Sequence, residues 1–399
     1  MKKILAGLLC AAILFTACAT PSSPAVTDIQ FTFLGNILLT DSGSVYTWGE
    51  NWRGLLGQGE DAEYTVTAPK KLDLPQPIEQ IYASFCGNTY YARGTDGQYY
   101  AWGDNSYQII PGSNAESVTS PVPVDFGFEV AELSVSLHQL TVQSADGRFY
   151  GCGTEQFTGS FIHPELTEKR AVSSPKLNEI HLPTDSPIVQ FQNGLTYRAF
   201  LDAQGQVYLY GCVSENRIIF PEPALQPYPE PITQICPVTE GLVTLGESGT
   251  LYYMGYDLFG IFSDDPQAVE QYQGLEHLSP EPITKLSEPV TEVFSGSDSV
   301  IVRTENGELY TWGYNFSRNN ADSAEWFATT PTLISMAEPA DHIRMGQFNS
   351  AIITQSGNVY IWGSNYQHSF SPQTAEDTFT PQLAFSITDP EAGFTLDGE

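Results

Sequence analysis

The sequence is poor in basic residues. Only 16 lysines and arginines stand against 47 aspartates and glutamates, which gives a formal net charge of −31. Proteins that bind nucleic acid need basic patches for the phosphates, so this charge argues against a nucleic-acid partner. It argues equally against electrostatic adhesion to anionic lipid. The acidic surface is expected mainly to keep the protein soluble, with a basic partner or cations as the alternative.

Residues that commonly mark catalytic or metal sites are also scarce. The six histidines are scattered without metal-ligand spacing, and the chain has neither a Gly-x-Ser-x-Gly elbow nor a phosphate-binding loop. We therefore expect no metal and no cofactor, and no catalytic residue can be named. Enzyme activity stays uncertain, with no activity the favoured expectation, because distant carboxylates could still meet in the folded chain.

Cysteine is infrequent and has no zinc-type spacing. Of six cysteines, four lie beyond the N-terminal segment, at Cys86, Cys152, Cys212 and Cys236. Small buried thiols without a partner are the simplest expectation for these four. A disulfide between Cys152 and Cys212 is the alternative.

Long apolar runs are confined to the N-terminus. Two lysines precede an apolar stretch from Ile4 to Phe15, and small residues follow, as in a bacterial signal peptide over residues 1–17. Phe15-Thr16-Ala17-Cys18 resembles a lipobox, which predicts cleavage before Cys18, lipid on its sulfur, and a tether over residues 18–27. We expect an extracytoplasmic lipoprotein that meets the membrane only through this lipid. Secretion after ordinary cleavage at Ala19 is the alternative.

One short phrase is present seven times. Its clearest copies are Val45-Tyr46-Thr47-Trp48-Gly49, Leu309-Tyr310-Thr311-Trp312-Gly313 and Val359-Tyr360-Ile361-Trp362-Gly363. The final glycines of all copies stand at 49, 103, 153, 211, 255, 313 and 363. Repeats near this period are typical of solenoids and propellers. A polar turn ending in glycine precedes each phrase, and another apolar run precedes each turn, so each unit contains a β-hairpin.

Two more strands complete each unit. An apolar pair such as Ile78 and Ile81 lies upstream, and a proline-led stretch such as Pro121-Val122-Pro123-Val124 lies downstream. Proline cannot donate to a strand ladder, which places the last strand at the outer rim. The sequence thus predicts an all-β fold, a seven-bladed β-propeller of four-stranded antiparallel blades over residues 28–388. Residues 389–399 are expected to form a C-terminal tail, and a monomer is expected.

The repeat resembles that of the regulator of chromosome condensation family. The stretch from Trp48 to Gly59 is similar to that family's W-G-x-N-x-x-G-Q-L-G-x-G, and Asn105, Asn315 and Asn365 match its asparagine. This resemblance implies the propeller fold. The G-Q-L-G segment is absent from units two to seven, and the exchange activity of the eukaryotic founder on a nuclear GTPase does not carry over.

The loops after the repeat glycines are the best candidate for a site. In a four-stranded blade, the first-to-second and third-to-fourth loops emerge at one end. Aromatic residues and arginine, which anchor protein interfaces, are present in these loops. The candidate ligand-binding residues are Trp52, Arg53, Tyr107, Phe157, Phe316, Arg318 and Tyr366. Several of these side chains could instead fold back onto the next blade.

Two functions of different classes are compatible with this pattern. The favoured one is an extracytoplasmic binding module whose loop face recognises a protein or a glycan. The alternative is a propeller enzyme, a polysaccharide lyase or hydrolase, with acids near its axis. A third, purely structural role in the cell envelope stays open.

Overall fold

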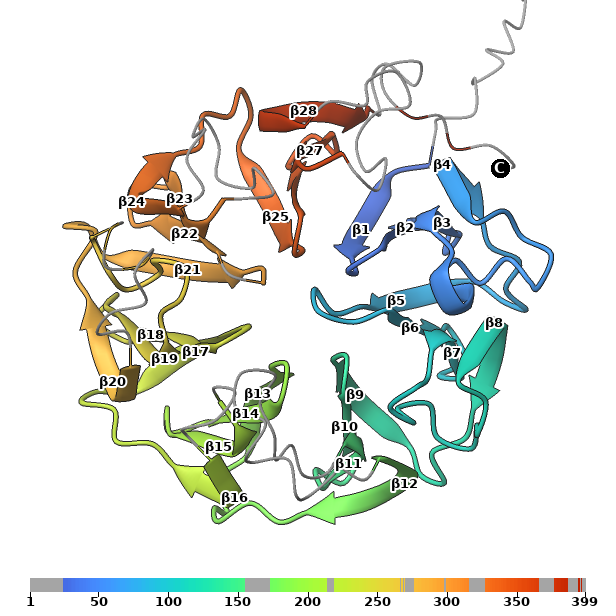
Figure 1. Ribbon diagram of the computed structural model, residues 1–399, viewed down its shortest axis with the longest axis horizontal. Helices are drawn as coiled ribbons and strands as arrows, with labels where there is room; N and C mark the ends of the chain where they lie inside the picture. The colour runs from blue at the N-terminus through green and yellow to red at the C-terminus, as the bar shows by residue number, and fades with distance from the viewer. Residues whose placement is uncertain are drawn as a thin grey trace, which may run out of the picture.

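The structure is a computed structural model, and it describes residues 24–154, 173–213, 219–265, 267, 269, 276–297, 299–315, 327–365, 377–386, 394 and 396. Over these residues the chain forms seven separate four-stranded antiparallel sheets. The sheets stand around a central axis like the blades of a propeller (Figure 1). The predicted fold class is therefore confirmed.

Each blade uses four strands that are consecutive in the chain. Blade 1 comprises β1 (Val26–Phe31), β2 (Gly35–Thr40), β3 (Val45–Glu50) and β4 (Thr65–Lys71). Blade 2 comprises β5 (Ile78–Tyr82), β6 (Thr89–Gly94), β7 (Tyr99–Asp104) and β8 (Ser117–Val124). Blade 3 comprises β9 (Val130–Val135), β10 (Gln139–Ser144), β11 (Phe149–Thr154) and β12 (Ser173–Ile180). Blade 4 comprises β13 (Ile188–Asn193), β14 (Tyr197–Asp202), β15 (Val207–Cys212) and β16 (Ile219–Leu225).

The remaining blades repeat this plan. Blade 5 comprises β17 (Ile232–Val238), β18 (Gly241–Gly246), β19 (Leu251–Tyr256) and β20 (Glu276–Ile283). Blade 6 comprises β21 (Val290–Ser295), β22 (Ser299–Thr304), β23 (Leu309–Tyr314) and β24 (Phe327–Leu333). Blade 7 comprises β25 (Ala340–Met345), β26 (Asn349–Thr354), β27 (Val359–Gly363) and β28 (Thr378–Phe385). A short 3-10 helix, η1 (Trp52–Gly54), follows β3.

The repeated phrase forms the third strand of every blade. Its tryptophans Trp48, Trp102, Trp312 and Trp362 have no exposed surface, because neighbouring blades cover both faces of the strand. The final glycine is required by geometry. At Gly49 φ is +117°, and an added Cβ would lie 2.7 Å from the carbonyl oxygen of Leu34. A side chain at this position would therefore clash with backbone.

The proline-rich fourth strands lie at the rim (Figure 1), as predicted. Their outer edges have no neighbouring strand within the sheet, and prolines such as Pro69, Pro121 and Pro331 interrupt the row of free donors. Such interruption protects an edge strand from pairing with another chain.

The ring closes between blade 7 and blade 1 by side-chain packing, since none of the described strands is exchanged between these blades. Trp48 of blade 1 packs against Phe385 of blade 7 at a ring-centroid distance of 6.2 Å, and against Phe394 at 5.9 Å. Near the axis, Arg344 Nε lies 2.9 Å from Asp28 Oδ1. Phe394 belongs to the segment predicted as a tail, and its side chain is buried in this seam.

The structure describes four of the six cysteines. Cys86, Cys152, Cys212 and Cys236 are all buried and none is joined in a disulfide, as expected for buried thiols, which contradicts the alternative Cys152–Cys212 disulfide. Burial raises the pKa of the Cys236 thiol to about 12, so this sulfur stays protonated. Among the described residues, no helix is both long and apolar enough to cross a membrane.

Candidate functional site

The first-to-second and third-to-fourth loops of each blade share one end of the ring, which we call the loop end. In blade 1 the backbone N–H of Glu50, at the end of β3, donates to the carbonyl of Leu34 in the β1–β2 turn at 2.9 Å. The N–H of Phe33 in that turn donates to Gly87 O in the corresponding turn of blade 2 at 3.0 Å. The candidate residues Trp52, Arg53 and Tyr107 lie in loops at this end.

The β3–β4 loop of blade 1 folds back onto blade 2. Its residues Leu55 and Leu56 are fully buried. Asn51 holds this turn, because its Oδ1 accepts the Leu56 N–H at 2.9 Å, and Thr47 Oγ1 donates to Leu56 O at 2.7 Å. Gly54 lies against β8, with φ at +76° and Thr119 Cα 2.5 Å from where a Cβ would be. The loop is thus fixed by packing on both sides.

Arg53 is a bridge between the two blades. Its Nη1 lies 3.2 Å from Glu116 Oε2 and its Nε 3.7 Å from Asp104 Oδ1. Its own carbonyl accepts a hydrogen bond from Ser117 Oγ at 2.8 Å. The residue also has a positive φ of 52°, which costs energy for a side chain with a Cβ. Arg53 therefore mainly links blade 1 to blade 2, and the carboxylates of Asp104 and Glu116 largely neutralise its charge.

The Trp52 side chain, which contacts Arg53, remains accessible to solvent. Its side chain is 36% exposed, and the Arg53 guanidinium carbon lies 4.9 Å from the centroid of its ring. A cation on one aromatic face holds the ring in place and leaves the remaining surface free for a ligand. Of the candidate residues that the structure describes, Trp52 best meets the requirement for a binding anchor.

Tyr107 is half-buried between blades 2 and 3. Its ring meets the edge of the His138 ring at a centroid distance of 4.3 Å. Burial, followed by the nearby Asp104 carboxylate, raises the pKa of the Tyr107 hydroxyl. His138 Nδ1 donates to Leu195 O at 3.1 Å, and burial lowers the pKa of His138 to about 4. Tyr107 is thus mainly part of a blade-to-blade contact.

The other predicted site residues lie outside the described part of the chain. They are Phe157, Phe316, Arg318 and Tyr366, together with the predicted lipidation site Cys18. The structure therefore brings together Trp52 and Arg53 and places Tyr107 apart, near the seam between blades 2 and 3.

Three exposed aromatic residues lie in blade 1, and the ring of one of them, Phe33, also packs against Phe348 of blade 7 at a centroid distance of 5.2 Å. Among the described residues, the large apolar side chains with high exposure include three aromatics, all at the loop end of blade 1: Phe33 at 38%, Trp52 at 36% and Tyr64 at 58%. We call these three residues the blade 1 patch. The remaining exposed members of that class are aliphatic and lie in other blades. An accessible group of aromatics of this kind is a typical interaction surface.

Sequence reasoning missed Phe33 and Tyr64 because neither follows a repeat glycine directly. Phe33 lies in the β1–β2 turn, and Tyr64 stands at the far end of the long loop, where its carbonyl accepts the Asn51 N–H at 2.6 Å. It also missed Asp257, which takes the place of the repeat asparagine in blade 5. Asp257 Oδ1 accepts the Ile261 N–H at 2.7 Å, just as Asn51 accepts that of Leu56.

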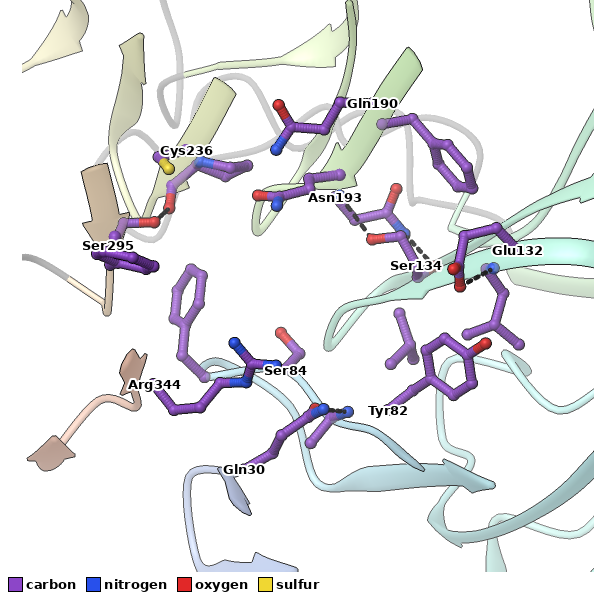
Figure 2. Close-up of a pocket in the computed structure, with 18 of the residues that line it drawn as sticks. Gln30, Tyr82, Ser84, Glu132, Ser134, Gln190, Asn193, Cys236, Ser295 and Arg344 are labelled. Carbon is purple, nitrogen blue, oxygen red and sulfur yellow. Dashed lines mark hydrogen bonds between the residues drawn. The ribbon is translucent and has the colours of Figure 1, made fainter. Parts of the chain in front are cut away.

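A second candidate site is a cavity of about 720 Å³ on the axis, lined mostly by the innermost strands of all seven blades. Figure 2 shows Gln30, Tyr82, Ser134, Gln190 and Arg344 around this cavity. Its charged lining residues are Asp28, Glu132 and Arg344. In the described part of the chain, no three histidine, cysteine or carboxylate side chains meet in a way that could hold a metal ion.

Glutamine side chains around the axis join neighbouring blades. In each blade the pairing of the first two strands shifts register, and Gln190 and Gln234 directly follow this shift in β13 and β17. Gln190 Nε2 donates to Ile235 O and its Oε1 accepts the Ile235 N–H, both at 2.9 Å. Gln234 makes the same pair of bonds to Val293, at 2.5 and 3.0 Å. Each amide thus hydrogen-bonds to a backbone N–H and a backbone carbonyl at the free edge of the next blade's innermost strand, as a neighbouring strand would.

Polar side chains also link neighbouring blades at the other seams. Gln30 bonds to Ile81 O and the Ala83 N–H across seam 1–2, and Gln80 donates to Glu132 across seam 2–3. The remaining links are Asn193 to Ser134, Arg303 to Ala340 O, and Arg344 to Asp28. Both carboxylates on the axis, Asp28 and Glu132, are therefore engaged in holding the ring. These contacts leave the loop end of blade 1 as the better candidate for ligand binding.

Fold, repeat and site together define a closed seven-bladed propeller with an accessible aromatic patch at one end. The family model described as the regulator of chromosome condensation (RCC1) repeat matches residues 42–90, and a second model of the same description matches residues 290–318. In these two segments the propeller thus carries repeats of the regulator of chromosome condensation type, as the resemblance predicted.

Known proteins and solved structures agree with this assignment. The chain is 24% identical to the human regulator of chromosome condensation over 303 residues, covering 69% of each protein. Its Xenopus laevis counterpart is 25% identical over 304 residues, covering 69% of this chain and 68% of the relative. The crystal structure of Saccharomyces cerevisiae Prp20p matches with a TM-score of 0.72 at 16% identity, covering 92% of this chain and 88% of Prp20p. Human WBSCR16 matches with a TM-score of 0.70 at 18% identity, covering 88% and 94%.

Proposed function

We propose that this protein is a protein-binding module that works outside the cytoplasm and contacts its partner through the blade 1 patch. The observation that carries this proposal is that, among the residues the structure describes, the exposed large aromatic side chains all lie at one end of blade 1. Apolar surface left in water is costly, by about 25 cal/mol per Å² relative to burial, so a partner that covers these rings gains affinity. Aromatic side chains are also the residue type that most often dominates binding energy at interfaces.

The patch rests on a rigid base. The Trp52 ring packs against the Arg53 guanidinium. The loop between Trp52 and Tyr64 is held in place by the buried contacts of Gly54, Leu55 and Leu56. Ordering a flexible loop on binding costs free energy, and a loop that is already fixed avoids much of that cost. The geometry therefore favours recognition by a preformed surface.

Proteins of the same fold support a protein ligand over a glycan. One solved structure is described as Kap60 bound to yeast RCC1 (Prp20), and matches this chain with a TM-score of 0.71. Another is described by the binding of Prp20p to Gsp1p and histones. These partners belong to Prp20 and none is transferred to this chain, but they show that a propeller of this architecture can bind proteins.

The location outside the cytoplasm is proposed from the N-terminal sequence. Lys2 and Lys3, the apolar stretch and Cys18 have the order of a lipoprotein signal. Replacing Cys18 by Ala is expected to abolish labelling with radioactive palmitate and to move the protein from the membrane fraction to the soluble fraction. Membrane association that persists unchanged without Cys18 would contradict the lipid anchor.

Binding is tested by capture of partners from envelope fractions and culture medium. Wild-type protein is compared with a variant carrying Phe33→Ala, Trp52→Ala and Tyr64→Ala. The matched control is Leu225→Ala, Leu278→Ala and Leu333→Ala, which removes three exposed apolar side chains from other blades. We expect a protein that wild type and control retain and the aromatic variant loses. Retention by all three proteins, or binding only on a glycan array, would overturn the proposal.

A further inference from the structure

The blade 1 patch lies in an acidic surrounding. The loop segments 50–64 and 104–116, which carry and support Trp52 and Tyr64, contain six carboxylates and a single basic residue, Arg53. Three of the carboxylates belong to solvent-exposed residues and follow one another closely between Trp52 and Tyr64. They are Glu60, Asp61 and Glu63.

The one local cation is already neutralised. Arg53 pairs with Glu116 and Asp104, at 3.2 and 3.7 Å. Glu50 accepts the Tyr64 hydroxyl at 3.5 Å, which brings a carboxylate against one ring of the patch. Glu60, Asp61 and Glu63 have no basic side chain among the described ion pairs, so their charge is free to act on a ligand.

The acidic segment is also held in place. The Gly59 N–H donates to Thr119 O of blade 2 at 2.9 Å, and at the other end the Asn51 N–H donates to Tyr64 O at 2.6 Å. The three carboxylates are therefore presented on a short loop tied at both ends, beside two exposed aromatic rings. Fixed charges next to a fixed apolar surface select a ligand by charge pattern and by shape.

We propose, building on the proposed function, that the partner of the blade 1 patch is a protein segment with lysine or arginine next to an exposed apolar side chain. The apolar side chain covers Trp52 and Tyr64, and the cationic side chains meet Glu60, Asp61 and Glu63. Such a pairing combines burial of aromatic surface with opposite charge at the rim. An acidic segment would meet four unneutralised carboxylates, Glu50 among them, and is rejected.

The charge part of this inference is tested with an array of synthetic 12-residue peptides of varied composition, followed by titration of the best peptides in fluorescein-labelled form. Full-length mature protein is compared with a variant carrying Glu60→Gln, Asp61→Asn and Glu63→Gln. The matched control, Asp41→Asn, Asp73→Asn and Asp125→Asn, removes the same charge from exposed turns at the opposite end of blades 1 and 2.

We expect bound peptides to be enriched in lysine or arginine beside tryptophan, phenylalanine or leucine. The affinity of these peptides should fall about tenfold for the variant with Glu60, Asp61 and Glu63 replaced, which we call the Glu60 variant, and less than about twofold for the control. For wild type alone, the affinity should also fall steeply as the salt concentration rises. Equal loss in both variants, or selection of neutral or acidic peptides, would overturn the inference. If the aromatic variant loses the captured partner while the Glu60 variant keeps it, the binding function stands and only the cationic class fails.

Discussion

Gln190 offers the sharpest test of how the ring is held together. Its side chain makes two hydrogen bonds of 2.9 Å to the backbone of Ile235, a residue with no exposed surface on the innermost strand of the next blade. Replacement by leucine keeps the size of the side chain. It removes the amide donor and acceptor that bond to the Ile235 carbonyl and N–H. Each hydrogen bond has a net worth of about 1 kcal/mol, and a buried group left unpaired costs about 1–3 kcal/mol.

We therefore expect Gln190→Leu to lower the free energy of unfolding by about 2–3 kcal/mol, with part of the loss offset where cavity water reaches Ile235. Gln192, two positions along the same strand, also lines the axial cavity. No hydrogen bond of its side chain is found among the described residues, so Gln192→Leu is a matched control with an expected change within about 0.5 kcal/mol.

Urea unfolding followed by tryptophan fluorescence and far-UV circular dichroism measures both variants. The slope of free energy against urea should stay that of wild type, since the surface exposed on unfolding is unchanged. Equal stability of the Gln190 and Gln192 variants would refute the role assigned to the amide. It would show that apolar packing alone sets the blade spacing.

Three further changes test separate parts of the structure. Trp312→Ala removes a fully buried ring and should cost about 3–5 kcal/mol in urea unfolding, and a cost under about 1 kcal/mol would contradict its burial. Gly54→Ala, at φ +76° and against Thr119, should cost at least about 1 kcal/mol, whereas Gly112→Ala, at a similar φ of +80° but with open space around it, should cost less. Burial lowers the pKa of His138 in the folded protein to about 4. As the pH falls from about 6.5 towards 4, this histidine is protonated in the unfolded chain but not in the folded protein, so wild type loses stability over this range. His138→Gln should remove up to about 3 kcal/mol of that loss, and identical pH dependence of the two proteins would contradict the assignment.

Much of the fold could be predicted because its determinants are local. The turn glycines, the aromatic strand and the proline-led strand recur in sequence, and each has a short-range physical cause that a single chain displays. The repeat glycine at Gly49 is an example, since its positive φ and contact with Leu34 admit no side chain.

The site was harder to predict because its contacts join segments far apart in the chain. Arg53 was predicted to bind a ligand, but Asp104 and Glu116, which neutralise its charge, come from the next repeat. Gln190 lies between the apolar residues Val189 and Phe191, and its role depends on the backbone of Ile235 in another blade. The way a loop folds onto the next blade and the contacts that close the ring depend on tertiary packing, which a repeat pattern does not encode.

The central claim, that the blade 1 patch contacts the partner, is tested most directly by site-specific photo-crosslinking in living cells. A photoreactive aromatic amino acid is incorporated in place of Phe33 or Tyr64, and for comparison in place of Leu225 or Leu278, which are also exposed but lie in blades 4 and 5. We predict that illumination yields one discrete crosslinked protein from the two blade 1 positions and none from the other two. A crosslink that forms only from Leu225 or Leu278 would contradict the account.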